Sequence, residues 1–190
     1  MKKLLLAVFS ITTTFSLYAQ REVPQERMEQ IYEEVKTPYK YGLAIAPADN
    51  HHKIDCPTVF RQGDKWLMTY VVYNGKSGTD GRGYETWIAE SDNLLEWRTL
   101  GRILSYRDGK WDCNQRGGFP ALPDMEWGGS YELQTYKGRH WMTYIGGEGT
   151  GYEAVKAPLY IGLASTKGDI STAHEWESLD KPILSIHDKD

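Results

Sequence analysis

The chain repeats a segment of its own sequence, and this repeat restricts the folds available to it more than any other feature. The hexapeptide at 65–70 (KWLMTY) returns at 139–144 (RHWMTY). Three further matches follow in the same order, 89–91 with 164–166, 96–97 with 175–176 and 103–105 with 183–185. The spacing grows in steps from 74 residues (Met68 to Met142) to 80 (Ile103 to Ile183), as expected if insertions fall in turns. Four ordered matches indicate an internal duplication.

The first copy has the pattern of four consecutive strands. Aromatic and β-branched residues mark strands at 58–61, 66–73, 84–90 and 97–104. A four-stranded meander that repeats is the unit of a β-propeller. Neither copy can bury both of its faces alone, so the copies must stack. We therefore predict an all-β fold made of four-stranded antiparallel blades.

Two blades are fewer than the 4–8 that propellers typically contain. The second copy ends at Leu184, close to the last residue, Asp190. We expect residues 50–190 to form the first two blades of a longer propeller. The alternative is a pair of sheets that pack on each other or on another protein.

The first residues have the pattern of a secretory signal peptide. Lys2 and Lys3 precede an apolar run at 4–15, and Ala19 stands at a plausible cleavage position. The run is shorter than the roughly 20 residues that a membrane-spanning helix needs. We therefore predict a signal peptide at 1–19 and an exported protein, periplasmic or extracellular, without a membrane span.

One helix is predicted between the leader and the strands. Met28, Ile31, Tyr32 and Val35 recur at helical spacing, and Thr37-Pro38 stops the pattern. The helix spans about 24–36 within an N-terminal connection, residues 20–49. We assign it no chemistry.

Composition excludes one class of partner and leaves the cysteines open. The 22 Lys and Arg residues against 26 Asp and Glu give a net charge of −4, without a basic run, so nucleic acid is not an expected partner. Cys56 and Cys113 lie 57 positions apart. In an oxidising compartment they could form a disulfide, and two small buried apolar residues are the alternative.

Two segments of the first copy resemble a known enzyme family. The run 54–60 (IDCPTVF), followed by 63–66 (GDKW) and 68–70 (MTY), resembles the first blade of five-bladed β-propeller glycoside hydrolases. These are the relatives of family 43 arabinosidases and xylosidases, with family 32 invertases and family 130 mannoside phosphorylases more distant. The segment 89–97 (AESDNLLEW) is similar to a turn found in many of their blades. The resemblance covers roughly 50–190 and implies a five-bladed propeller that cleaves glycosidic bonds in a carbohydrate.

The resemblance also implies a catalytic carboxylate. In these enzymes an Asp before a Pro, on the innermost strand of blade one, faces the central funnel as base or nucleophile. Asp55 matches this position, although Cys56 separates it from Pro57. A turn-capping carboxylate is the alternative role. Glycoside cleavage requires two carboxyl groups, and Glu132, on the expected innermost strand of blade two, is the candidate general acid.

The connection 105–129 is the candidate for substrate binding. Connections of this length in a compact domain are usually functional or disordered. We expect the Trp111 ring to stack on a sugar, with Asp112 and Arg116 hydrogen-bonding to hydroxyl groups. Trp127 is expected to fill the gap between the blades.

His52 precedes Asp55 by three positions and could line the sugar site. An exposed loop histidine is the alternative, and a metal site is not expected because no second group of ligands is near it in sequence. No cofactor is expected, although a structural cation could sit in the funnel. The oligomeric state is not predicted. Two other functions remain open: a glycoside phosphorylase, and a non-catalytic carbohydrate-binding propeller fragment.

Overall fold

The structure is a computed structural model that describes residues 23–36, 42–47, 49, 51–75, 81–151 and 157–188. The predicted signal peptide at 1–19 lies outside the described residues. The protein divides into two compact units, Met1–Lys40 and Tyr41–Asp190, which are described separately.

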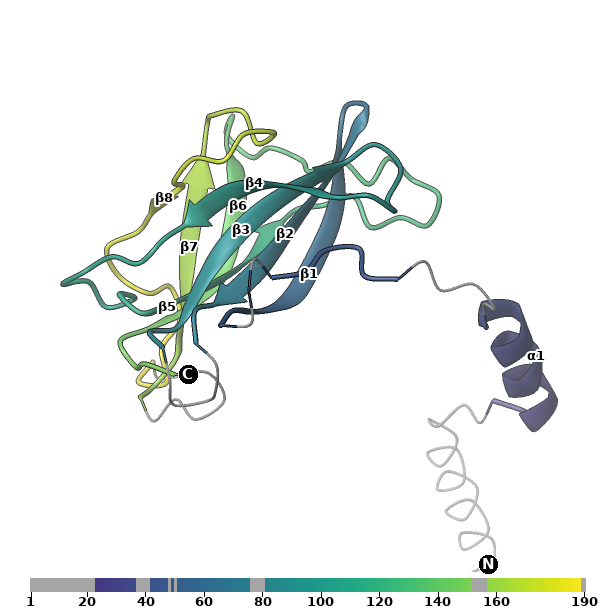
Figure 1. The fold of residues 1–190 in the computed structure, drawn as a ribbon, viewed down its shortest axis with the longest axis horizontal. Coiled ribbons are helices and arrows are strands. Elements are labelled where there is room, and N and C mark those ends of the chain that lie inside the picture. Colours follow the sequence, from purple (N-terminus) through teal and green to yellow (C-terminus); the bar gives the residue numbers. More distant parts are fainter. Residues whose placement is uncertain are drawn as a thin grey trace, which may run out of the picture. The chain divides into compact units, whose positions relative to one another are not determined.

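The first unit contains the predicted helix, α1, which spans Gln25–Val35 (Figure 1). Pro24 stands at the N-terminal boundary, and its carbonyl oxygen accepts the Met28 N–H at 3.1 Å. The backbone becomes extended at Lys36. The boundaries differ from the predicted 24–36 by one residue at each end.

The second unit begins with the predicted meander. Its first sheet has the order β1-β2-β3-β4, with every neighbouring pair antiparallel (Figure 1). Strand β1 spans Lys53–Gln62, β2 spans Lys65–Tyr73, β3 spans Tyr84–Ser91 and β4 spans Arg98–Leu104. The prediction of four strands is confirmed, and β1 is longer than the segment 58–61 indicates.

A second antiparallel sheet follows, with the order β5-β6-β7-β8. Strand β5 spans Gln115–Ala121, β6 spans His140–Gly147, β7 spans Tyr160–Thr166 and β8 spans Glu177–Ser178. The repeated hexapeptides lie in β2 and β6, and the second matching pair lies in β3 and β7. The structure thus confirms an all-β fold with two four-stranded antiparallel sheets and one short helix.

The first strand of the second sheet is not where the sequence predicts it. Residues 105–129, expected to form one long connection, contain β5 (QRGGFPA). Glycine and proline are depleted in strands, so this segment lacks a strand signal. Its glycines allow close packing, because a Cβ at Gly118 would lie 2.4 Å from Sδ of Met142.

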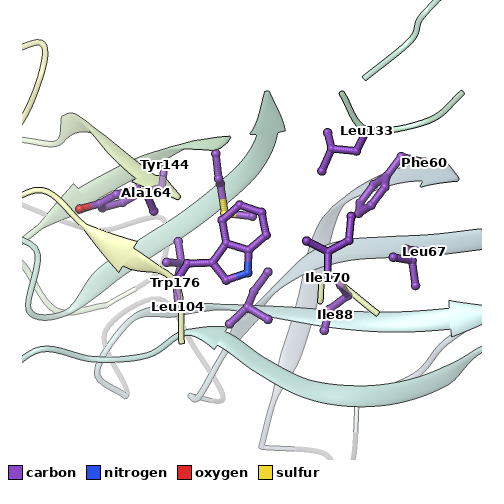
Figure 2. Close-up of a cluster of buried hydrophobic side chains, with 11 residues drawn as sticks. Phe60, Leu67, Ile88, Leu104, Leu133, Tyr144, Ala164, Ile170 and Trp176 are labelled. Atoms are coloured by element: carbon purple, nitrogen blue, oxygen red, sulfur yellow. The ribbon is translucent and has the colours of Figure 1, made fainter. Parts of the chain in front are cut away.

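The main hydrophobic core lies between the two sheets (Figure 2). Phe60, Leu67 and Ile88 contribute from the first sheet. In Figure 2, Trp176 lies between these side chains and Tyr144 of β6. The backbone N–H of Trp176 donates to the carbonyl oxygen of Ile103 at 2.9 Å, so the segment before β8 is bound to β4. The two copies therefore fold as one body.

A second cluster covers the opposite face of the first sheet. Side chains alternate between the two faces of a strand, so Met68, Tyr70 and Val72 of β2 point away from the core that contains Leu67. They pack with Ala89 and partly buried neighbours, among them Trp87. Among the described residues, no helix is long and apolar enough to cross a membrane.

Candidate functional site

The two sheets share one edge, at which β1 and β5 begin and β2 and β6 end. The contact at this edge is direct, because the N–H of Tyr84, the first residue of β3, donates to Oε1 of Gln115, the first residue of β5, at 3.3 Å. A Cβ at Gly83 would overlap the carbonyl oxygen of Asn114. We call this the β1/β5 edge. It brings the start of β1 and the connection before β5 to the same side of the molecule.

Asp55 lies at the β1/β5 edge, near the start of β1. It is opposite Val71 of β2, and the register shifts between Asp55 and Thr58. The irregularity is a β-bulge, in which Cys56 has a positive φ of 51° and Pro57 has no N–H to leave unpaired. Oδ1 of Asp55 accepts the Cys56 N–H at 2.7 Å. The carboxylate is exposed and also caps this turn.

The thiol beside Asp55 is not activated. Partial burial, followed by the negative charge of Asp55, raises the pKa of Cys56. Burial likewise raises the pKa of Cys113. Both cysteines are free in the structure, so neither is positioned as a thiolate nucleophile.

The structure does not bring Glu132 to Asp55. Glu132 is exposed in the connection between β5 and β6, where it bridges to Arg61 near the other end of β1. Six residues of β1 separate Arg61 from Asp55, which is roughly 20 Å at about 3.3 Å per residue. Paired carboxyl groups of glycosidases are about 5–9.5 Å apart. The predicted position of Glu132 on the innermost strand is wrong, and the two residues cannot form a catalytic pair in this arrangement.

Asp112 and Arg116 have no exposed surface, so the structure does not present them to a sugar. Nε and Nη2 of Arg107 donate to Oδ1 of Asp112 at 3.1 and 2.7 Å, and the Tyr144 hydroxyl donates to Oδ2 at 2.7 Å. Arg116 pairs with Oδ2 of Asp112 at 3.2 Å and with Oε1 of Glu175 at 2.6 Å. We call these five residues the buried ion-pair network.

The buried ion-pair network connects segments distant in sequence: the connection before β5, β5 itself, β6 and the segment before β8. Burial, followed by the hydrogen bond to Asp112, raises the pKa of Tyr144 to about 12, so its hydroxyl keeps its proton. The prediction that Asp112 and Arg116 bind substrate is therefore replaced by a structural role.

The two tryptophans of the predicted binding loop have exchanged roles. Trp111 packs against the core, with its ring stacked on Tyr144 at 5.8 Å and edge-on to Tyr160 at 6.1 Å. A Cβ at Gly146 would lie 2.6 Å from the Trp111 ring. Trp127, expected to fill the gap between blades, is 96% exposed. Trp111 therefore fills the space assigned to Trp127.

His52 lies on the face of the first sheet that carries the second hydrophobic cluster. It lines a cavity of about 300 Å³, together with Pro47, Ile54, Tyr70, Val72 and Trp87. Its Nδ1 is 2.8 Å from Oδ1 of Asp49, and this bond is the main reason why the pKa of Asp49 is lowered. The cavity wall is mostly apolar, with His52 as its titratable group.

Sequence reasoning missed the polar residues that line the β1/β5 edge beyond β1. Nε of Arg82 donates to Oδ1 of Asn114 at 2.6 Å, its guanidinium group lies 4.5 Å from the centre of the Tyr106 ring, and it pairs with Asp108. Glu148, which is exposed, directly follows β6. The repeat offers a signal for Glu148, because β2 ends one residue before Asn74 in the same way.

The described residues contain no group of three or more His, Cys, Asp or Glu side chains that could hold a metal ion. The edge therefore presents carboxylates and hydrogen-bonding groups. This arrangement is suited to proton transfer and to binding of hydroxyl groups.

Comparison with known proteins gives matches among solved structures. The protein is similar to a structure described as "Glycoside hydrolase" and to a second structure, described as a complex of BT0996 and RGII. Each is 94% identical with a TM-score of 0.82, and each match covers 89% of this protein and 48% of the other. The sequence thus spans about half the length of these two relatives.

A third structure is Zg3597, a family 117 glycoside hydrolase of the marine bacterium Zobellia galactanivorans. It is 11% identical with a TM-score of 0.48, over 68% of this protein and 38% of the other, and carries no weight here. No family model and no curated protein matches the sequence.

Proposed function

We propose that this protein is the N-terminal part of an exported glycoside hydrolase that cleaves the glycan named RGII. The observation that carries the proposal is 94% identity, over 89% of the sequence, to a structure described as a glycoside hydrolase. The second 94% identical structure is described as a complex with RGII, which supports that glycan as the ligand. The match to only 48% of these relatives supports a longer protein that continues the series of sheets.

Within this proposal, Asp55 is the ionised carboxylate of the reaction. It is exposed at the β1/β5 edge, and its neighbours at this edge can bind hydroxyl groups. The general acid must lie within about 5–9.5 Å of it, which Glu132 does not. Glu148, exposed at the same edge, takes the place of Glu132 as the described candidate.

The chemistry follows from the two carboxyl groups. A protonated carboxyl group donates to the leaving oxygen of the glycosidic bond. The ionised carboxylate attacks the anomeric carbon directly or removes a proton from the attacking water. The separation of the two groups decides between retention and inversion of configuration.

The test uses the complete protein with RGII as substrate and chromatography of the released sugars. Asp55→Asn keeps an oxygen that can accept the Cys56 N–H, so the fold should remain and turnover should fall by several orders of magnitude. Asp55→Ala should lose turnover to the same extent and also lose about 1 kcal/mol of stability, because the capping bond disappears. Asp64→Asn, in the turn between β1 and β2, is the matched control and should keep the wild-type rate.

Each alternative function has its own outcome in this assay. Near wild-type turnover in Asp55→Asn would leave Asp55 with only its capping role. A sugar phosphate formed only when inorganic phosphate is added would indicate a phosphorylase. Binding of the glycan without cleavage by the wild-type protein would indicate a non-catalytic binding protein.

Export is tested separately. Mass spectrometry of the mature protein from the periplasm or medium should give an N-terminus near Gln20. An intact Met1 on the mature protein would contradict cleavage of the proposed signal peptide.

A further inference from the structure

Trp127 is the most exposed tryptophan of the described residues, with 96% of its surface accessible. It lies on the turn 124–131 in the connection between β5 and β6 (Figure 1). Tryptophan is highly buried on average, and exposed apolar surface commonly marks a binding site. The other apolar side chain of strong exposure on this turn is Met125, at 79%.

The turn that carries Trp127 is held in one conformation by its own hydrogen bonds. The Asp124 carboxylate accepts the N–H of Ser130 at 2.7 Å, the hydroxyl of Ser130 at 2.6 Å and the N–H of Glu126 at 3.1 Å. The hydrogen bond from the Ser130 hydroxyl is the largest cause of the lowered pKa of Asp124. On the far side of the tryptophan, the N–H of Gly128 donates to the Tyr131 hydroxyl at 2.8 Å.

The turn is also attached to the first sheet. The carbonyl oxygen of Tyr131 accepts the N–H of Arg61 at 2.8 Å, and the Tyr131 ring lies 5.9 Å from the ring of Trp66. The Asp124 N–H donates to the carbonyl oxygen of Glu132 at 2.9 Å. The turn is therefore ordered before any ligand arrives, which reduces the entropic cost of binding.

The surroundings of Trp127 favour a glycan over a protein partner. Exposed polar side chains stand on both sides of it in the connection: Glu126, Glu132, Gln134 and Lys137. The centre of a protein–protein interface is instead depleted of charged residues. A pyranose ring has an apolar face of C–H groups and a rim of hydroxyl groups. A flat indole with carboxylate, amide and ammonium groups near it matches both parts.

We propose that the turn 124–131 is a second carbohydrate-binding surface, on which the indole of Trp127 stacks on a sugar of a large glycan. The proposal rests on the proposed function for the class of its ligand. It does not rest on the catalytic residues, because the turn bridges to Arg61, at the end of β1 opposite Asp55. This surface holds a distant part of a polymer while the β1/β5 edge contacts the bond to be cleaved.

The test compares a polymer with a small substrate, using the complete protein. The probes are the RGII polymer, in native affinity gels that give a dissociation constant, and the aryl glycoside that the wild-type protein hydrolyses fastest. The variants are Trp127→Ala and Trp127→Phe. Tyr32→Ala is the matched control, because Tyr32 is another exposed aromatic residue, 63% exposed on α1.

The proposal predicts that Trp127→Ala weakens binding of the polymer about five- to tenfold, since an aromatic contact contributes about 0.5–1.5 kcal/mol. Trp127→Phe should retain most of the affinity, and Tyr32→Ala all of it. Hydrolysis of the aryl glycoside should be unchanged, since one sugar cannot reach both surfaces. Polymer binding that depends on Trp127, in a protein that cleaves no glycoside, would support this surface and refute the proposed function.

Two results would overturn the proposal. The first is a dissociation constant for the polymer that Trp127→Ala changes less than twofold. The second is protection of Trp127 from oxidation by N-bromosuccinimide in the complete protein without glycan, together with a melting temperature lowered by several degrees in Trp127→Ala. That second result would assign the indole to a contact with another part of the protein.

Discussion

The buried ion-pair network gives the sharpest test of how the structure revises the predicted site. Sequence reasoning assigns Arg116 to sugar binding, whereas the structure gives its side chain no exposed surface. Arg116→Met keeps the length of the side chain and removes its charge. Asp112 then remains buried with Arg107, and Glu175, whose side chain is 46% exposed, can turn to water.

The magnitude follows from which groups lose a partner. Removal of one partner of a buried ion pair costs about 3–5 kcal/mol, because a buried charge remains uncompensated. Asp112 keeps the Arg107 guanidinium group at 2.7 Å and the Tyr144 hydroxyl at 2.7 Å, so we expect the lower end, about 3 kcal/mol. At about 2–4 °C per kcal/mol for a domain of 150–250 residues, the melting temperature should fall by about 6–12 °C.

The assay is thermal and chemical unfolding of the complete protein, with the KM for RGII measured on the same preparation. Lys110→Met is the control, because its ion pair with Asp180 is exposed, and it should change stability by less than about 1 kcal/mol. In a double-mutant cycle, Arg116→Met and Asp112→Asn should couple by more than about 0.5 kcal/mol. An unchanged melting temperature with a raised KM would refute the reasoning and return Arg116 to the substrate site.

Three further outcomes are expected from unfolding measurements. Gly162→Ala should destabilise the protein by about 1–3 kcal/mol or more, because its Cβ would lie 2.2 Å from Cζ of Tyr144. Wild-type stability at this residue would contradict the packing of β7 on β6. Tyr144→Phe should lower the free energy of unfolding by about 1–2 kcal/mol, through the lost bond to Asp112, and an unchanged value would contradict that bond. Burial lowers the pKa of His140 below its ordinary 6.5. As the pH falls below about 6.5, the unfolded protein therefore binds the proton first, and stability is lost as the pH falls through the folded-state pKa. His140→Gln should flatten this part of the curve, and an equally steep curve would argue against the assignment.

The sequence is sufficient to predict the strands that build the core. Lys65–Tyr73 and Tyr84–Ser91 combine β-branched and aromatic residues. Such residues fit a pleated, half-buried surface, so pattern alone locates them. Because the second copy repeats these segments, the duplication locates β6 and β7 as well.

Sequence reasoning fails at β5 for a physical reason that also explains the misplaced site residues. Its glycines and proline have low β-propensity, and their use is visible only once Met142 and Leu104 are seen to pack on Gly118. With β5 hidden inside an expected loop, the pattern assigns Arg116 to that loop and Glu132 to the innermost strand. The burial of Asp112 depends on partners 5 to 32 positions away, and no local pattern contains this information.

The two copies differ most where the proposed chemistry lies. Asp55 is opposite Val71 on β2, and the repeat aligns Val71 with Ile145 on β6, which is opposite Gly117. Gly117 is therefore the counterpart of Asp55. A Cβ at Gly117 would already lie 3.3 Å from Cγ1 of Val71, so this position has little room for a carboxylate. The second sheet uses the position for close packing against the first. The carboxylate at the β1/β5 edge therefore belongs to the first copy alone, and its partner must come from a residue outside the repeated pattern.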